Sequence, residues 1–235
     1  MDKYIFNTTQ KEIQSKKYNI FIGISLGGLK PLTEELAEEY ISWALKNTKE
    51  KVIILVADVI AKFNYKIFSK YSEGKSLKNA IKEGDKYEIF FERVISKFSK
   101  KDQSNIIILR WKDIWSKRLC KIKNKLDDQY VSNDNFKRIV LSFVEKYAEK
   151  RKKKLDDKKL DYLSQYILSE LPTLLDGVKY ESKKYSLLVY PTFAHSGMSD
   201  FITKIEKGAI FPALKKSLNL DRSVAIVEFH LPVIN

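Results

Sequence analysis

The sequence predicts a single α/β domain of Rossmann-like type over residues 1–235, with a mostly parallel sheet flanked by helices. Continuous apolar runs of strand length alternate with segments of helical periodicity, which is typical of strands buried on both faces of a parallel sheet. The chain is also 44% hydrophobic and 12% aromatic, which is enough for one sizeable core. A disordered chain is therefore excluded.

The first elements are a strand and an amphipathic helix. Residues 18–25 (YNIFIGIS) predict a short buried strand that ends among glycines. Residues 33–47 predict a helix with Thr33 as its N-cap and acidic residues in its first turn. The apolar face of this helix should carry Leu36, Tyr40, Trp43 and Ala44.

The chain then continues with alternating strands and helices. Residues 52–58 (VIILVAD) and 105–110 (NIIILR) predict two further buried strands, and residues 77–98 between them predict a helix. A charged helical region is expected from about residue 112 to 171, where Pro172 should end the last helix.

Two apolar runs in the C-terminal part, 185–190 and 223–229, predict strands, and 197–206 between them predicts a helix. Ligands of such sheets bind beyond the carboxyl ends of the strands. The residues that this rule singles out are Ser25, Asp58, Arg110, Tyr190 and Pro191.

Charge and composition narrow the range of possible functions. The formal net charge of +14 favours a polyanionic partner, such as nucleic acid, anionic lipid or an acidic protein. Only 6 of the 44 basic residues are arginine, which points to phosphate contacts and not to base-specific recognition. The chain shows neither an apolar run long enough for a membrane span nor an apolar secretory leader. We therefore expect a cytoplasmic protein without a membrane partner.

Metal and nucleotide chemistry find little support in the sequence. A single cysteine, Cys120, forms neither an internal disulfide nor a thiolate metal site, and two distant histidines make a zinc site improbable. Neither a P-loop nor a dinucleotide-binding glycine pattern is present. We expect no metal and no cofactor.

Three of the eight glycines surround Ser25, namely Gly23, Gly27 and Gly28. Glycines at this position let the backbone turn sharply and leave the serine hydroxyl unobstructed. They also leave nearby amide N–H groups available to bind an oxyanion. A nucleophilic serine is one interpretation, and an ordinary glycine-rich turn is the other.

The same stretch fits G-x-S-x-G, the nucleophile elbow of α/β-hydrolases. Two observations weaken this match. Pro31 interrupts the chain before the next helix, and the only histidines that could act as a base are the distant His195 and His230. A serine hydrolase remains an alternative function.

A second group of polar residues lies at 162–172, where Tyr166 and Glu170 are spaced i, i+4 and share one face of a predicted helix. A phenol beside a carboxylate is suited to hold an ammonium group, although a core tyrosine next to a surface glutamate has the same spacing. Tyr190 places another phenol at the sheet edge that carries Ser25.

Taken together, these residues resemble the cyclodipeptide synthases. The resemblance consists of Ser25 after Gly23 at the end of the first strand, Y-x-x-x-E (Tyr166 and Glu170) followed by Leu-Pro, and Tyr190 at the end of a late strand. One type within this family has Asn three residues after the serine and Tyr-His at the late strand. Gly28 and Tyr190–Pro191 occupy those positions here, so the chain resembles the other, XYP type.

The resemblance implies a fold similar to the catalytic domain of the tyrosyl- and tryptophanyl-tRNA synthetases (class Ic), without their ATP machinery. It implies that two aminoacyl-tRNAs are joined into a cyclic dipeptide in a ping-pong reaction. Ser25 would be the nucleophile that carries the first aminoacyl group. Tyr166 and Glu170 would grip the aminoacyl ammonium, and Tyr190 would support the serine and proton transfer.

The resemblance also places a basic helix, here 77–98, against the tRNA. Its cations are Lys78, Lys82, Lys86, Arg93 and Lys97. Residues expected by position to line the aminoacyl pocket are Phe21, Gly23, Ile53, Ile107, Leu188 and Pro191. Their apolar character favours hydrophobic amino acids. We expect a monomer, and a non-catalytic tRNA-binding protein is a further alternative.

Overall fold

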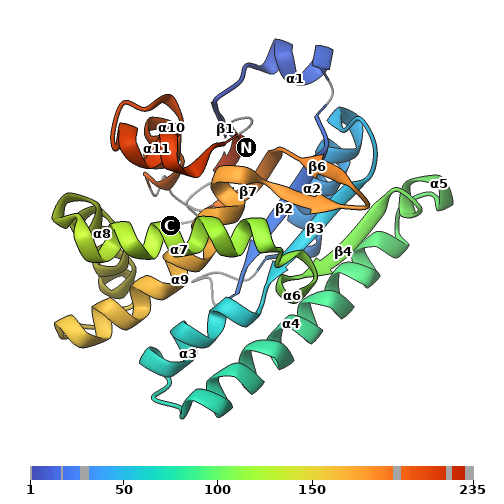
Figure 1. Ribbon diagram of the computed structural model, residues 1–235. Coiled ribbons are helices and arrows are strands. Elements are labelled where there is room, and N and C mark those ends of the chain that lie inside the picture. The colour runs from blue at the N-terminus through green and yellow to red at the C-terminus, as the bar shows by residue number, and fades with distance from the viewer. Residues whose placement is uncertain (1, 17, 27–31, 193–196, 221–223, 231–235) are drawn as a thin grey trace.

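The computed structural model describes residues 2–16, 18–26, 32–192, 197–220 and 224–230, in which helices cover both faces of a sheet (Figure 1). The sheet has six strands in the order β1-β8-β7-β2-β3-β4. All neighbours pair in parallel except β1 and β8. Their bounds are β1 Asp2–Phe6, β2 Ile20–Ser25, β3 Val52–Ala57, β4 Ile106–Arg110, β7 Leu187–Thr192 and β8 Ala225–His230. The predicted, mostly parallel sheet is confirmed.

The helices and a small hairpin complete the fold. The helices are α1 Gln10–Lys16, α2 Glu34–Asn47, α3 Lys62–Phe68, α4 Glu73–Ser96, α5 Lys100–Gln103, α6 Trp111–Ile114, α7 Lys117–Ser132, α8 Asp134–Lys150, α9 Asp157–Asp176, α10 Met198–Lys207 and α11 Pro212–Leu218. A 3₁₀ turn, η1 (Val59–Ala61), precedes α3, and β5 (Val178–Tyr180) pairs antiparallel with β6 (Lys183–Tyr185). None of the helices in the described ranges has the length and apolar character that a membrane span requires.

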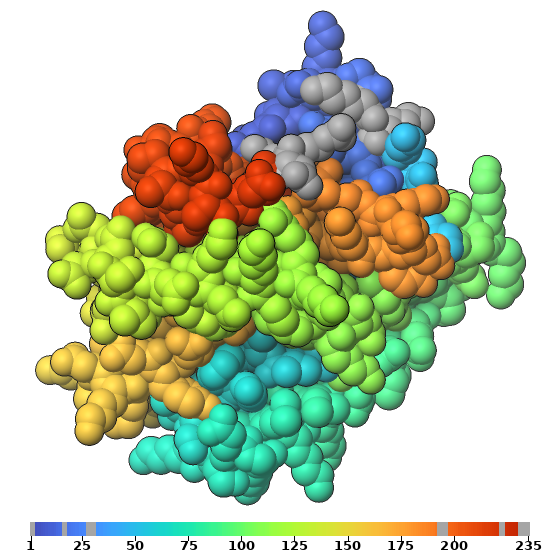
Figure 2. Space-filling model, viewed as in Figure 1, coloured from blue at the N-terminus to red at the C-terminus, as the bar shows by residue number. Residues whose placement is uncertain are grey.

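Alternate residues along each strand supply two separate cores. Ile20, Ile22 and Ile24 of β2 face α2 and α4. Phe21 lies on the opposite face of the same strand, with α6 to α11. On that face α7 crosses between α10 and α11 on one side and α3 and α4 on the other (Figure 2). Burial on both faces explains why these strands are apolar throughout.

The ends of the helices follow local capping. Thr33 accepts a hydrogen bond from the Leu36 backbone N–H, which confirms it as the N-cap of α2. The helix predicted over 77–98 begins four residues earlier, as α4, because Ser72 accepts a hydrogen bond from the Lys75 N–H.

The expectation that Pro172 ends its helix is wrong, because α9 continues to Asp176. Its last turn buries Leu171 and Leu175 completely in the core, and this burial outweighs the backbone hydrogen bond that proline cannot donate. Gly177, with φ +73°, then ends the helix.

The run at 185–190 also divides differently from the prediction. Tyr185 ends β6, and β7 begins at Leu187. The elements that escaped prediction altogether are β1, α1, η1, α3, α5, β5 and α11. They are short, and β1 pairs only with a strand more than 200 residues away in the sequence.

Asp58 and Arg110, which the strand-end rule singles out, form a buried ion pair that fastens α4 to the sheet. The Arg110 guanidinium donates to Asp58 Oδ2 from Nε at 3.0 Å and from Nη2 at 2.8 Å. Its Nη1 reaches Asp85 and Glu88 of α4, each at 2.9 Å. Asp58 and Arg110 therefore stabilise the packing of α4 against the sheet.

The close approach of α4 to this ion pair depends on Gly84. A Cβ atom at Gly84 would lie 2.3 Å from Arg110 Nη2 and 2.7 Å from Asp58 Cβ. Gly84→Ala should therefore lower the free energy of unfolding by about 1–3 kcal/mol, measured by urea denaturation.

Gly74 in the same helix is the matched control. A Cβ there meets nothing within 4 Å. Gly74→Ala should leave stability unchanged or raise it by up to about 1 kcal/mol. Equal effects of the two substitutions would contradict the steric argument.

Candidate active site

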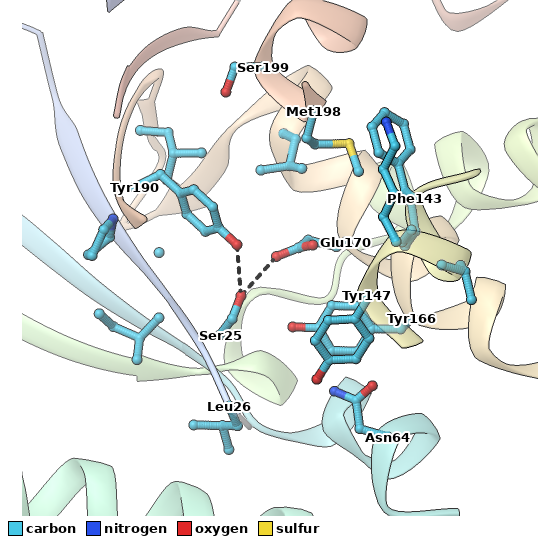
Figure 3. A pocket seen from close by; sticks show the side chains of 18 of the residues that line it. Ser25, Leu26, Asn64, Phe143, Tyr147, Tyr166, Glu170, Tyr190, Met198 and Ser199 are labelled. Carbon is cyan, nitrogen blue, oxygen red and sulfur yellow. Dashed lines mark hydrogen bonds between the residues drawn. The ribbon is translucent and has the colours of Figure 1, made fainter. Parts of the chain in front are cut away.

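A cavity of about 650 Å³ opens at the carboxyl ends of β2 and β7. The two strands form its floor, and α8, α9 and α10 supply most of its walls (Figure 3). The lining is mainly apolar, and some of its polar side chains converge on one point. Such a cavity is typical of a site for a small organic group.

The point of convergence is Ser25, the last residue of β2. Its Oγ donates a hydrogen bond to Glu170 Oε1 at 3.4 Å and lies 3.2 Å from the Tyr190 hydroxyl (Figure 3). Parallel pairing of β2 with β7 brings Tyr190 to the same edge, and α9 places Glu170 opposite. The structure thus brings together three residues that are far apart in the sequence.

Tyr166 lies one helical turn before Glu170 on α9 and lines the same cavity. Burial raises the pKa of its phenol well above the usual value, and the Glu170 carboxylate raises it further. The pKa of Tyr190 is raised as well, first by burial and then by Glu170. Both phenols therefore keep their protons at neutral pH and can donate hydrogen bonds.

Glu170 is the electrostatic centre of the cavity. Burial raises the pKa of its carboxyl to about 7, and the hydrogen bond from Ser25 opposes this shift only in part. Within the described ranges, no lysine or arginine forms an ion pair with it. A cationic ligand would supply the missing charge.

Gly23 allows β7 to pack against β2 beside the serine. A Cβ there would lie 3.0 Å from Leu188 Cδ1 and 3.6 Å from Tyr190 Cδ2. The other two glycines of the expected oxyanion loop, Gly27 and Gly28, lie outside the described residues, as does His195. His230 ends β8, and only its backbone is described.

Of the residues expected to form an aminoacyl pocket, Leu188 and Pro191 line the cavity together with Gly23. Phe21 lies in a smaller adjoining recess. Ile53 and Ile107, which were expected to line the same pocket, line neither space. They pair with each other one step from the start of β3 and β4, too far from the carboxyl edge.

Residues that sequence reasoning missed complete the lining. Leu55 and Ala57, further along β3, border the smaller recess in place of Ile53. Asn64 of α3, Tyr147 of α8 and Met198 of α10 line the main cavity. No local pattern marks them, because they meet only when three helices pack around the sheet.

The five cations expected to contact tRNA all lie on α4 or at its C-cap, Lys97. The structure separates them into two groups. Arg93 and Lys97 form ion pairs with Glu34 at 2.6 and 2.7 Å. Lys86 pairs with Glu83 at 2.8 Å, whereas Lys78 and Lys82 are exposed and make no ion pair with any residue that the structure describes.

The fold and the cavity define an α/β protein with a serine at the carboxyl edge of a parallel sheet, next to a buried carboxyl and two phenols. The family model for cyclodipeptide synthases matches residues 5–204. The chain therefore belongs to the cyclodipeptide synthase family of enzymes. No curated protein sequence matches it.

Solved structures share this fold at low sequence identity. A cyclodipeptide synthase from Staphylococcus haemolyticus is 21% identical, with a TM-score of 0.69 over 98% of this chain and 100% of that chain. A Mycobacterium tuberculosis protein, described as demonstrating that cyclodipeptide synthetases are related to type I tRNA synthetases, is 14% identical, with a TM-score of 0.63 over 84% of each chain. The synthetase-related Rossmann-like fold expected from the sequence is confirmed.

A third structure shows a relative with a ligand. The cyclodipeptide synthase from Candidatus Glomeribacter gigasporarum, bound to Phe-tRNAPhe, is 14% identical to this chain. Its TM-score is 0.57, over 92% of this chain and 89% of that chain.

The raised pKa of Glu170 predicts a specific dependence of stability on pH. The folded protein holds this proton up to about pH 7, whereas the unfolded chain releases it near the ordinary value of 4.5. Between these values the folded state binds more protons, so the free energy of unfolding falls as pH rises, by up to about 3 kcal/mol from this group.

Glu170→Gln removes the titration and keeps the shape of the side chain. Relative to wild type, the variant should gain stability between pH 5 and pH 8, measured by urea denaturation across that range. Parallel pH profiles for the two proteins would contradict a raised pKa for Glu170.

Proposed function

We propose that this protein joins two aminoacyl groups, delivered by aminoacyl-tRNAs, into a cyclic dipeptide through an aminoacyl ester on Ser25. The contact of Ser25 Oγ with Glu170 and Tyr190 at the floor of the cavity carries the proposal. Membership of the cyclodipeptide synthase family and the fold shared with a Phe-tRNAPhe-bound relative support it.

The first step is a transesterification. Ser25 Oγ attacks the carbonyl carbon of the aminoacyl-tRNA ester, the bond from that carbon to the ribose oxygen breaks, and the serine proton passes to the departing ribose oxygen. The Tyr190 hydroxyl, 3.2 Å from Oγ, supports the serine during this transfer. One ester replaces another, so no ATP is required, and we propose no metal or cofactor.

The second aminoacyl-tRNA then reacts with the enzyme-bound ester. Its amino group attacks the serine ester, which forms a peptide bond and restores the Ser25 hydroxyl. The free amino group of the dipeptide attacks the remaining tRNA ester, closing the six-membered ring and releasing the tRNA. Covalent catalysis divides the coupling into steps that each engage one tRNA.

Glu170 and Tyr166 hold the ammonium of the first aminoacyl group in this scheme. A cation beside Glu170 favours its carboxylate form and so lowers the pKa that burial has raised. The Tyr166 hydroxyl, one turn away on α9, accepts a second hydrogen bond from the same ammonium.

The apolar part of the cavity selects the amino acid side chain. Leu188 and Pro191 of β7 line it together with Met198 and Ile202 of α10. We propose hydrophobic amino acids as substrates. Because such a pocket separates similar apolar side chains by only about 1–3 kcal/mol, a mixture of products is expected.

The tRNA body binds along α4 in this proposal. Of the five cations expected to contact tRNA, Lys78 and Lys82 form no ion pair in the described part of the chain, so they are available to phosphates. We propose that the protein is a single domain that acts as a monomer. Use of aminoacyl-tRNA would place the reaction in the cytoplasm.

Ser25→Ala should abolish the product and leave tRNA binding nearly unchanged. Bacteria that express wild type should release new diketopiperazine masses into the medium, detected by mass spectrometry, and the variant should release none. Purified wild type mixed with charged tRNA should yield an aminoacyl adduct on the peptide that contains Ser25. Product formation without this adduct, or by the variant, would overturn the serine ester.

The hydrolase alternative requires a histidine base, and His195 and His230 are the only candidates. Replacing both with Ala should leave most of the diketopiperazine yield in the same assay, because Ser25, Glu170 and Tyr190 contact one another without a histidine. Loss of all activity in a variant that still folds would favour the hydrolase.

A further inference from the structure

A second serine, Ser199 near the start of α10, lines the active-site cavity together with Met198 and Ile202 of the same helix (Figure 3). Its hydroxyl donates a hydrogen bond to Oε1 of Glu228 on β8. Both residues are buried, with exposed fractions of 3% for the serine and 1% for the glutamate. The proposed acyl transfer uses neither residue.

Glu228 lies behind Ser199 and does not itself line the cavity. Strand β8 presents Ile226 to the cavity, and Glu228, two residues further along, lies on the same face of this strand. In the sheet register it pairs with Tyr190 of β7. The Ser199 hydroxyl therefore connects this buried carboxylate to the cavity.

The hydrogen bond to Glu228 fixes the polarity that Ser199 presents to a ligand. A carboxylate only accepts hydrogen bonds, so the single hydroxyl proton of Ser199 is directed toward Glu228. The lone pairs of the Ser199 oxygen remain for the cavity. This point of the wall is therefore an acceptor, and it suits a ligand that donates a hydrogen bond.

The surroundings of this acceptor are apolar, because Met198, Ile202 and Ile226 line the cavity with it. A side chain that fills such a space displaces water from the acceptor, so a ligand with a donor is favoured over one without. Serine or threonine would supply a donor but leave the apolar wall uncovered. The side chain of tyrosine supplies both an apolar ring and a terminal donor.

We propose that Ser199 is a specificity-determining residue that accepts a hydrogen bond from the side chain of an aminoacyl substrate, and that Glu228 is the residue that positions it. The substrate class is an aromatic amino acid with a terminal donor, with tyrosine preferred to phenylalanine. The inference rests on the proposed function, in which the α10 side of the cavity holds the amino acid side chain. It narrows the hydrophobic substrates proposed there to those that also carry a donor.

The test varies the amino acid and keeps the RNA constant. One tRNA is acylated by a ribozyme with tyrosine, phenylalanine or O-methyltyrosine. Equal amounts of two of these are added to the full chain, together with tRNAs charged with the other amino acids. Mass spectrometry gives the ratio in which the two competitors enter all diketopiperazines, which is the ratio of their kcat/KM values.

Wild type should incorporate about tenfold more tyrosine than phenylalanine, because one hydrogen bond to a buried acceptor separates them. O-methyltyrosine keeps the ring and the oxygen but cannot donate, so it should compete no better than phenylalanine. Phenylalanine is smaller than tyrosine and O-methyltyrosine is larger, so a size limit alone would not exclude both. Use of either one as readily as tyrosine would overturn the inference.

Ser199→Ala removes the acceptor, and the ratio of tyrosine to phenylalanine should fall from about ten to about one. Ser199→Thr keeps the hydroxyl and should retain most of the preference. Glu228→Gln supplies a neutral partner that no longer fixes the hydroxyl proton, and it should lower the ratio several-fold. Each ratio is measured within one protein, so a substitution that only loosened α10 would slow both substrates alike and leave the ratio unchanged.

Ser76→Ala is the matched control. Ser76 is also buried, with 1% of its surface exposed, but its hydroxyl donates to the backbone carbonyl of Ser72 at 2.9 Å and it does not line the cavity. This variant should keep the wild-type ratio of tyrosine to phenylalanine.

The failure of this inference is distinguishable from failure of the proposed function. A preference for tyrosine that survives Ser199→Ala, or diketopiperazines that contain neither tyrosine nor phenylalanine, would overturn the role of Ser199 while the products themselves uphold the synthase reaction. An unchanged ratio in Glu228→Gln would contradict the positioning role of Glu228. If wild type made no diketopiperazine from any charged tRNA, the proposed function itself would fail.

Discussion

The candidate site depends on one constraint: a carboxyl group, Glu170, lies inside a largely apolar cavity and receives a hydrogen bond from a serine but forms no ion pair with the described lysines and arginines. Burial of this kind disfavours the charged form, which is why the pKa of Glu170 rises to about 7. Such an arrangement is costly for a protein that only needs to fold. It is useful where a ligand brings its own positive charge.

The scaffold around Glu170 makes this arrangement rigid. The parallel register between β2 and β7 fixes Ser25 beside Tyr190, and α9 carries Glu170 over that sheet edge. The last turn of α9 packs Leu171 and Leu175 into the core, so Glu170 is held near the middle of a well-buried stretch of helix and not at a frayed end. The proline within this turn is tolerated because the surrounding core holds the helix in place.

The sequence predicted those features that short-range patterns determine. Apolar runs indicated the strands, the strand-end rule selected Ser25 and Tyr190, and the i, i+4 spacing placed Tyr166 and Glu170 on one helix face. Contacts between distant elements were not predictable in this way. Ile53 and Ile107 were expected at the pocket because they lie on strands that end near it. How far a residue lies from the carboxyl end of its strand becomes clear only once the ends of the strand are known.

The net charge can be read from the sequence, but the ion pairs between distant residues cannot. A net charge of +14 indicates a polyanionic partner but not where it binds, because a cation already paired with a carboxylate contributes less to the external field. Packing of α2 against α4 pairs Arg93 with Glu34, and Lys97 with Glu34 and Glu38, contacts that only the tertiary structure reveals. The distribution of unpaired lysines, and not their number, therefore determines where a phosphate backbone finds the strongest attraction. Lys146 and Lys150 of α8, which form no ion pair in the described part of the chain, line the cavity that contains Ser25.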